Sequence, residues 1–148
     1  MSEGFAAAER RVRDSFAKQA FMTLLGAKLV RVSPGEVDIE LPFRADLVQQ
    51  HGYLHAGVTT AIADSACGYA ALSLMLPDAA VLSVEYKVNM LSPAQGRRFL
   101  AQGRVVKSGR TITVVRGDVL AFDERDEARA VLAMQGTMIS ATGRGISD

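Results

Sequence analysis

The chain has 148 residues, a length that suits one domain able to bury its own core without disulfides or metals. Hydrophobic residues make up 49% and charged residues 22%, which is ordinary for a globular protein. The 17 basic and 16 acidic residues leave a net charge of +1, which gives no reason to expect nucleic acid or an anionic membrane as the main partner.

The single cysteine and the N-terminal residues narrow the class further. Cys67 alone excludes an internal disulfide framework and a cysteine-based zinc site, so a reducing, cytoplasmic location is expected. Charged residues between positions 9 and 14 interrupt any apolar core, so no signal peptide is predicted. Residues 57–76 are long enough to span a bilayer, but Asp64 and Gly68 within them favour a buried helix of a globular domain.

In chain order, the first predicted element is an amphipathic helix over residues 3–23. Its apolar stripe consists of Phe5, Ala8, Val12, Phe16, Ala20 and Thr23. Strands are predicted at 27–32 and 36–41, because a Ser-Pro-Gly turn separates two segments of strand character. Residues 42–52 lack periodicity and are predicted to form a loop.

The second half is predicted to be one long helix followed by four strands. The helix begins near Ala56 or Gly57 and ends before Pro77, and the strands are expected at 81–91, 99–107, 111–122 and 130–140. Residues 141–148 are expected to fray. This order predicts one α+β domain over residues 1–148, in which a curved antiparallel sheet wraps a central helix and a second subunit completes the cover.

Asp64 is the only acidic residue between His51 and Leu76. Burying a carboxylate without a partner costs several kcal/mol, so its presence in an apolar helix indicates a function. The alternative is a structural pair with a backbone donor or with an arginine of a partner chain. Upstream, Ala56 and Gly57 start the helix, where free N–H groups can stabilise a developing oxyanion. For Gly57 the alternative is a plain helix-start glycine.

The segment Gln49-Gln50-His51-Gly52-Tyr53-Leu54-His55-Ala56-Gly57, with Asp64 seven residues later, resembles a known family motif. It is similar to the motif of hotdog-fold acyl-CoA thioesterases of the phenylacetate-pathway (PaaI-like) type. That motif has an Asn, a Gly three residues on, His-Gly-Gly, and then a helical acid. The resemblance extends more weakly over roughly residues 25–140. It implies a hotdog fold, hydrolysis of acyl-CoA, a homodimer or dimer of dimers, and no metal or redox cofactor.

The resemblance also implies roles for individual residues. Asp64 would act as general base or nucleophile, and the backbone N–H of Ala56, with Gly57 beside it, would polarise the thioester carbonyl. His55 matches a residue that holds the loop and the thioester region. Gln49 stands where the family has Asn, and its longer side chain departs from the pattern. Ser83 resembles a position that assists the water.

The CoA moiety would meet a basic hairpin in this resemblance, formed by Lys107, Arg110 and Thr111. Each role has a plainer alternative: loop locking for His55, an ordinary loop amide for Gln49, a plain strand serine for Ser83, and solvated charges for Lys107 and Arg110. Cys67, among small residues, is interpreted as core filler rather than a nucleophile.

Geometry along the helix suggests where the site lies. Gly57 and Asp64 are about 10 Å apart along the axis, too far to act on one thioester carbon. Relatives pair the turn of one subunit with the acid of the other, so a site at a dimer interface is expected. Two other functions stay open: a hotdog hydratase or dehydratase, and a non-catalytic acyl-CoA-binding protein. The acyl group is undetermined.

Overall fold

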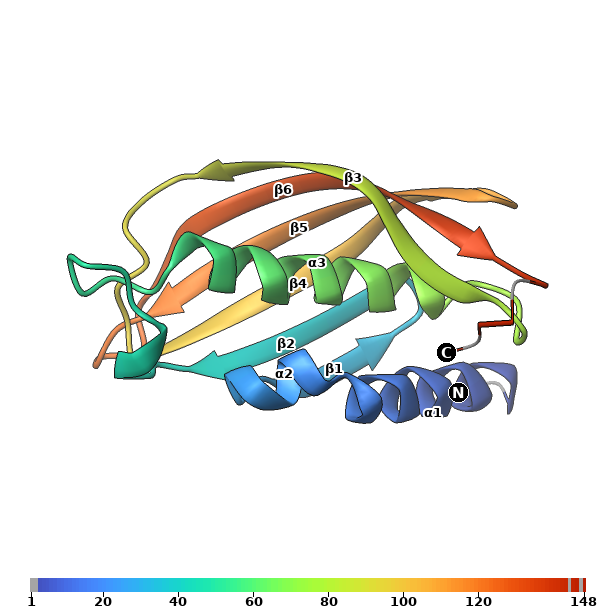
Figure 1. The fold of residues 1–148 in the computed structure, drawn as a ribbon, viewed down its shortest axis with the longest axis horizontal. Helices are drawn as coiled ribbons and strands as arrows, with labels where there is room; N and C mark the ends of the chain where they lie inside the picture. Colours follow the sequence, from blue (N-terminus) through green and yellow to red (C-terminus); the bar gives the residue numbers. More distant parts are fainter. Residues whose placement is uncertain (1–2, 144, 147) are drawn as a thin grey trace.

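A curved antiparallel sheet wraps one long helix, as Figure 1 shows. The computed structural model describes residues 3–143, 145–146 and 148. The elements are α1 (Glu3–Lys18), α2 (Ala20–Leu25), β1 (Lys28–Ser33), β2 (Glu36–Pro42), the 3-10 helix η1 (Ala45–Leu47), α3 (Ala56–Leu72), β3 (Ala80–Met90), β4 (Arg98–Ser108), β5 (Ile112–Phe122) and β6 (Ala128–Ala141). The strand order is β1-β2-β4-β5-β6-β3, so the predicted architecture is confirmed.

Helix α3 approaches the sheet closely because two strands carry glycine beneath it. A Cβ built on Gly103 of β4 would lie 2.2 Å from the carbonyl of Ala66. A Cβ on Gly117 of β5 would lie 2.8 Å from Cys67 Sγ. Any larger residue at these positions would push the helix away from the sheet. The two glycines therefore fix the distance between α3 and the sheet. This distance also determines where the side chains on the helix face away from the sheet lie.

The single helix predicted over residues 3–23 is wrong in one respect, because the helix breaks at Gln19. That residue adopts an extended backbone (φ −77°, ψ 95°) between α1 and α2. The break shifts the apolar stripe, so Met22 and Leu25 are buried while Ala20 and Thr23 are exposed. No glycine or proline marks the position, so the periodicity of apolar residues predicted one continuous helix there.

Helix α3 ends at Leu72, earlier than predicted, and residues 73–79 form turns before β3. Arg11 of α1 stabilises this end, because its guanidinium donates to the carbonyls of Leu72 (2.7 Å) and Met75 (3.0 Å) and also to that of Leu76. A cation at a helix C-terminus satisfies free carbonyls and complements the helix dipole. The contact ties α1 to the central helix.

The predicted frayed tail over residues 141–148 is only partly described, since residues 144 and 147 lie outside the described residues. Asp148 does make contacts, which differs from the expectation. Its carboxylate accepts hydrogen bonds from Ser15 Oγ (2.8 Å) and from the backbone N–H of Val81 (2.7 Å). The end of the chain therefore returns to α1 and the start of β3.

Strand β3 forms one edge of the sheet and exposes large apolar side chains. Leu82, Val84, Tyr86 and Met90 are 44–55% exposed. An edge strand with free backbone groups and apolar side chains is a surface that another chain can cover. Among the described residues, no helix combines the length and the apolar character that crossing a membrane requires.

Candidate active site

Asp64 and Ser83 lie in direct contact, although the sequence separates them by a helix end and a turn. Ser83 Oγ donates to Asp64 Oδ1 at 2.7 Å and also lies 3.3 Å from Met138 Sδ. A β-bulge between Ser83 and Glu85 turns Ser83 toward the helix. The period-two pattern of β3 would have placed Ser83 on the same face as Glu85, away from α3. The bulge therefore creates the contact.

Two cavities meet at Asp64. The larger, of about 510 Å³, runs along the exposed face of α3. Its lining residues are Gln19, Phe21, Ala56, Gly57, Thr60, Ala61, Asp64, Ser65 and Tyr86. The smaller, of about 110 Å³, contains Asp64 and Ser83 together with Gln19, Tyr69 and Asp148. The carboxylate of Asp64 is thus half-buried between an open groove, which can admit a substrate, and a small polar cavity.

The helix start has a specific hydrogen-bond arrangement. His55 is the N-cap of α3, and its Nδ1 accepts from the backbone N–H of Gly57 at 2.8 Å. Because Nδ1 is an acceptor, the neutral ring carries its proton on Nε2. The N–H of Gly57 is thereby occupied. Among the described residues, no acceptor is found for the N–H of Ala56, which is exposed at the first helical position.

The predicted site residues fall into two groups, one at the start of α3 and one near its middle, where Asp64 contacts Ser83. His55, Ala56 and Gly57 lie at its start, and Gln49 lines a separate pocket with Ala56 beside the end of β3. The side-chain oxygen of Gln49 accepts from the backbone N–H of His51. Gly57 and Asp64 are seven positions apart in the continuous helix α3, which is about 10 Å along the axis. One chain therefore does not bring the turn and the acid to one atom.

The basic hairpin belongs to the end of the sheet where Ser83 lies. Ser83 pairs with Met138, Met138 with Thr113, and Thr113 with Ser108. Three strand spacings, about 14 Å, separate Ser83 from the first residue of the hairpin. Lys107, Arg110 and Thr111 are exposed on it, and they line neither cavity at Asp64. Figure 1 shows this hairpin at the end of the sheet remote from the start of α3.

Cys67 is buried in the core one turn beyond Asp64, and desolvation raises its pKa to about 12, with the Asp64 carboxylate adding to the shift. We expect the folded protein to give no reaction with Ellman's reagent at pH 8, because the thiol stays protonated and inaccessible. The denatured chain should release one equivalent of chromophore. Rapid labelling of the folded chain would contradict the interpretation of Cys67 as core filler.

Sequence reasoning missed three residues that line the groove. Gln19 and Phe21 come from the N-terminal helices, and Tyr86 from the edge strand. Phe21 lies off the apolar stripe predicted for residues 3–23, and an aromatic residue off the stripe is the one hint that was present. Among the described residues, no group of three or more His, Cys, Asp and Glu side chains could hold a metal ion.

Comparison with known proteins gives consistent likenesses. The sequence model of the thioesterase superfamily matches residues 51–133. A thioesterase family protein from Silicibacter pomeroyi has 48% identity and a TM-score of 0.90, covering 92% of this chain and 99% of that one. The 1,4-dihydroxy-2-naphthoyl-CoA hydrolase of Listeria monocytogenes is 28% identical over 90 residues, which are 61% of this chain and 73% of that protein.

A further likeness concerns the fold alone. The PaaI protein of E. coli, from the phenylacetic acid degradation operon, has a TM-score of 0.82 at 19% identity, covering 93% of this chain and 96% of that one. Together with the sheet and helix described above, these likenesses confirm the predicted hotdog fold.

Proposed function

The chain belongs to the thioesterase superfamily, and from this we propose that the thioesters it hydrolyses are acyl-CoA esters. The observation that carries the proposal is the 2.7 Å contact between Ser83 Oγ and Asp64 Oδ1 at the groove on α3. The hydroxyl orients the carboxylate, and the groove gives a substrate access to it. The CoA ester named for the Listeria relative supports the choice of substrate class.

In this proposal, Asp64 acts on the thioester carbon either as a general base through a water or as a nucleophile. By the first route, a water attacks the carbon and gives its proton to the carboxylate, while the carbonyl electrons move onto oxygen. Collapse of the intermediate expels the CoA thiolate. By the second route, Asp64 attacks the carbon directly and the CoA thiolate leaves, which forms a mixed anhydride that a water then hydrolyses. Ser83 holds one carboxylate oxygen in both routes.

The N–H of Ala56 is the proposed donor to the developing oxyanion. It is exposed and lies at the positive end of α3, while the neighbouring N–H of Gly57 bonds to His55. His55 therefore has a positioning role, because its cap fixes the turn that aims the Ala56 donor. Gln49, bonded to the backbone of His51, has a similar role in the loop.

A second copy of the chain is needed to complete this site, because Ala56 and Asp64 are too far apart in one chain. We propose a homodimer in which the turn of each subunit meets Asp64 of the other. The exposed apolar edge strand β3 supports such a pairing, since covering it removes apolar surface from water. A dimer of dimers is compatible with the same site.

The experiment that tests the function is the release of free thiol from a panel of acyl-CoA esters, covering acetyl, hexanoyl, decanoyl and phenylacetyl groups. Hydrolysis of at least one ester with a kcat/KM in the ordinary enzyme range, about 10⁴ M⁻¹s⁻¹ or more, is the expected result. Binding of acyl-CoA without thiol release would instead support a non-catalytic binding protein. Addition of water to an enoyl-CoA would support a hydratase.

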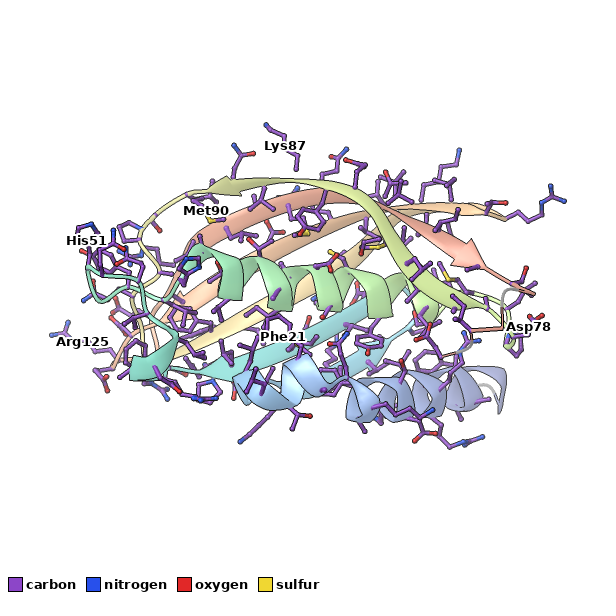
Figure 2. All side chains as sticks on the ribbon, viewed as in Figure 1. Phe21, His51, Asp78, Lys87, Met90 and Arg125 are labelled. Atoms are coloured by element: carbon purple, nitrogen blue, oxygen red, sulfur yellow. The ribbon has the colours of Figure 1, made fainter. Side chains whose placement is uncertain are left out.

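Replacing Arg110 with alanine should raise KM for acyl-CoA about fivefold, because an exposed cation beside the CoA phosphates contributes modestly. KM for an acyl N-acetylcysteamine thioester, which lacks the nucleotide, should not change. Arg125 is a matched control, since it is exposed on a turn at the opposite end of the sheet, as Figure 2 shows. Equal effects of Arg110→Ala on both substrates would remove the CoA role of the hairpin.

A further inference from the structure

The N-terminal helices contribute a wall to the groove at Asp64, although they lie outside residues 51–133, which match the thioesterase superfamily. We propose that the junction between α1 and α2 selects the acyl group: Phe21 packs against the acyl chain, and Gln19 holds the junction in place. The inference rests on the proposed function, because it assigns the groove beside Asp64 to the acyl part of an acyl-CoA ester.

Gln19 connects the junction to the residue that follows the acid in α3. Its side-chain oxygen accepts a hydrogen bond from Ser65 Oγ at 3.1 Å. Gln19 also lines both cavities that meet at Asp64. The helix break at Gln19 makes this contact possible, because the extended backbone there lets the side chain turn from the N-terminal helices toward α3. Gln19 is therefore a positioning residue for the junction.

Phe21 follows Gln19 by two residues, and its side chain lines the groove. Figure 2 shows its ring between α2 and α3. The side chain is 51% exposed, although the neighbouring Met22 on the same short helix is fully packed in the core. The helix face across the groove carries only small residues, Gly57, Thr60 and Ala61. A large apolar ring opposite a smooth helix face suits an acyl chain that lies between them.

The position of the small residues along α3 is consistent with a thioester carbon next to Asp64. Thr60 and Ala61 lie one turn before Asp64, so a chain that passes between them and Phe21 has its carbonyl end near the carboxylate. One helical turn is about 5.4 Å, so the single methyl group of an acetyl ester ends before this turn, whereas the longer chain of a hexanoyl ester extends along it. Contact with Phe21 should therefore depend on acyl length, and this dependence separates an acyl wall from a general structural role.

The test compares acetyl-CoA and hexanoyl-CoA as substrates of the full chain and its variants. Phe21→Ala should lower kcat/KM for hexanoyl-CoA about tenfold, mainly through KM, and change that for acetyl-CoA less than twofold. Leu24→Ala is the matched control, because Leu24 is 67% exposed on the same helix and does not line the groove. It should leave both substrates unchanged. Phe21→Leu should restore most of the hexanoyl activity.

The anchoring role of Gln19 is tested by comparing kcat/KM for hexanoyl-CoA with kcat/KM for acetyl-CoA. Ser65→Ala removes the hydrogen bond to Gln19, and it should lower kcat/KM for hexanoyl-CoA about threefold more than kcat/KM for acetyl-CoA. A loss of activity that is equal for the two substrates would contradict the anchor role.

Three outcomes would overturn the proposal: equal loss on both substrates in Phe21→Ala, no loss on either, or dissociation of the oligomer in gel filtration with loss of all activity. The last would show that Phe21 is covered by a second subunit. These failures leave the thioesterase function in place, since wild-type hydrolysis of acyl-CoA is measured in the same series. Absence of wild-type hydrolysis would instead overturn the proposed function.

Discussion

Asp64→Asn should lower kcat for acyl-CoA hydrolysis about 10³- to 10⁴-fold while the protein keeps its fold and oligomeric state. Asparagine has nearly the same shape as aspartate, and its side-chain oxygen can still accept the hydrogen bond that Ser83 donates at 2.7 Å. The amide cannot take a proton from water or attack a thioester carbon. The loss should therefore fall on the chemical step, with KM changed little.

The measurement is thiol release with the best wild-type substrate, together with the melting temperature from circular dichroism. Asp14→Asn is a matched control, because Asp14 is an exposed carboxylate on α1 remote from the groove. It should retain full activity. An Asp64→Asn protein that keeps more than about a tenth of the wild-type kcat would show that Asp64 is structural, as a half-buried partner of Ser83.

Ala56→Pro should lower kcat about 10²- to 10³-fold, the usual effect of losing one oxyanion donor. Proline removes the backbone N–H of Ala56 and leaves the rest of the turn in place. It is tolerated here because Ala56 is the first residue of α3, where the N–H makes no bond within the helix. The preceding residue, His55, already has the extended backbone (φ −61°, ψ 137°) that a following proline requires.

Ala56→Gly provides the matched control, since it changes the side chain and keeps the N–H. Its kcat should stay within about threefold of wild type. Circular dichroism and gel filtration should show the same helix content and oligomeric state for both variants. Full activity in a folded Ala56→Pro protein would exclude Ala56 as the donor and would point to a different group, such as the N–H of Gly57 after release of His55.

Much of the fold could be predicted from local pattern. The alternation of apolar and polar residues at 36–41 and 81–91 predicted strands of an antiparallel sheet. The long apolar segment after Ala56, with Asp64 as its one charge, favoured a buried helix over a membrane span. Where the predicted helix over 3–23 was wrong, no local signal marked the break at Gln19, after which Met22 and Leu25 pack in the core. Tertiary contacts there outweigh helix propensity.

The candidate site also has parts that the sequence predicts and parts that it does not. The isolated charge of Asp64 and the turn before α3 stand out in the sequence because both conflict with a plain apolar helix. The part played by Phe21 could not be predicted, since its groove is formed by α2, α3 and β3, which are distant in sequence. The difference between the two N–H groups at the helix start also emerges only from the tertiary structure, because the N–H of Gly57 donates to the ring of His55.

The sequence by itself determined the class of the protein: one helix within an antiparallel sheet, a single acid in that helix, and a motif typical of acyl-CoA thioesterases. The tertiary structure alone decided which groups meet. Ser83 reaches Asp64 because one extra residue in β3 reverses the face of the strand. Such a bulge is stabilised by pairing with β6 and by the helix above it, which are long-range contacts that no local pattern encodes.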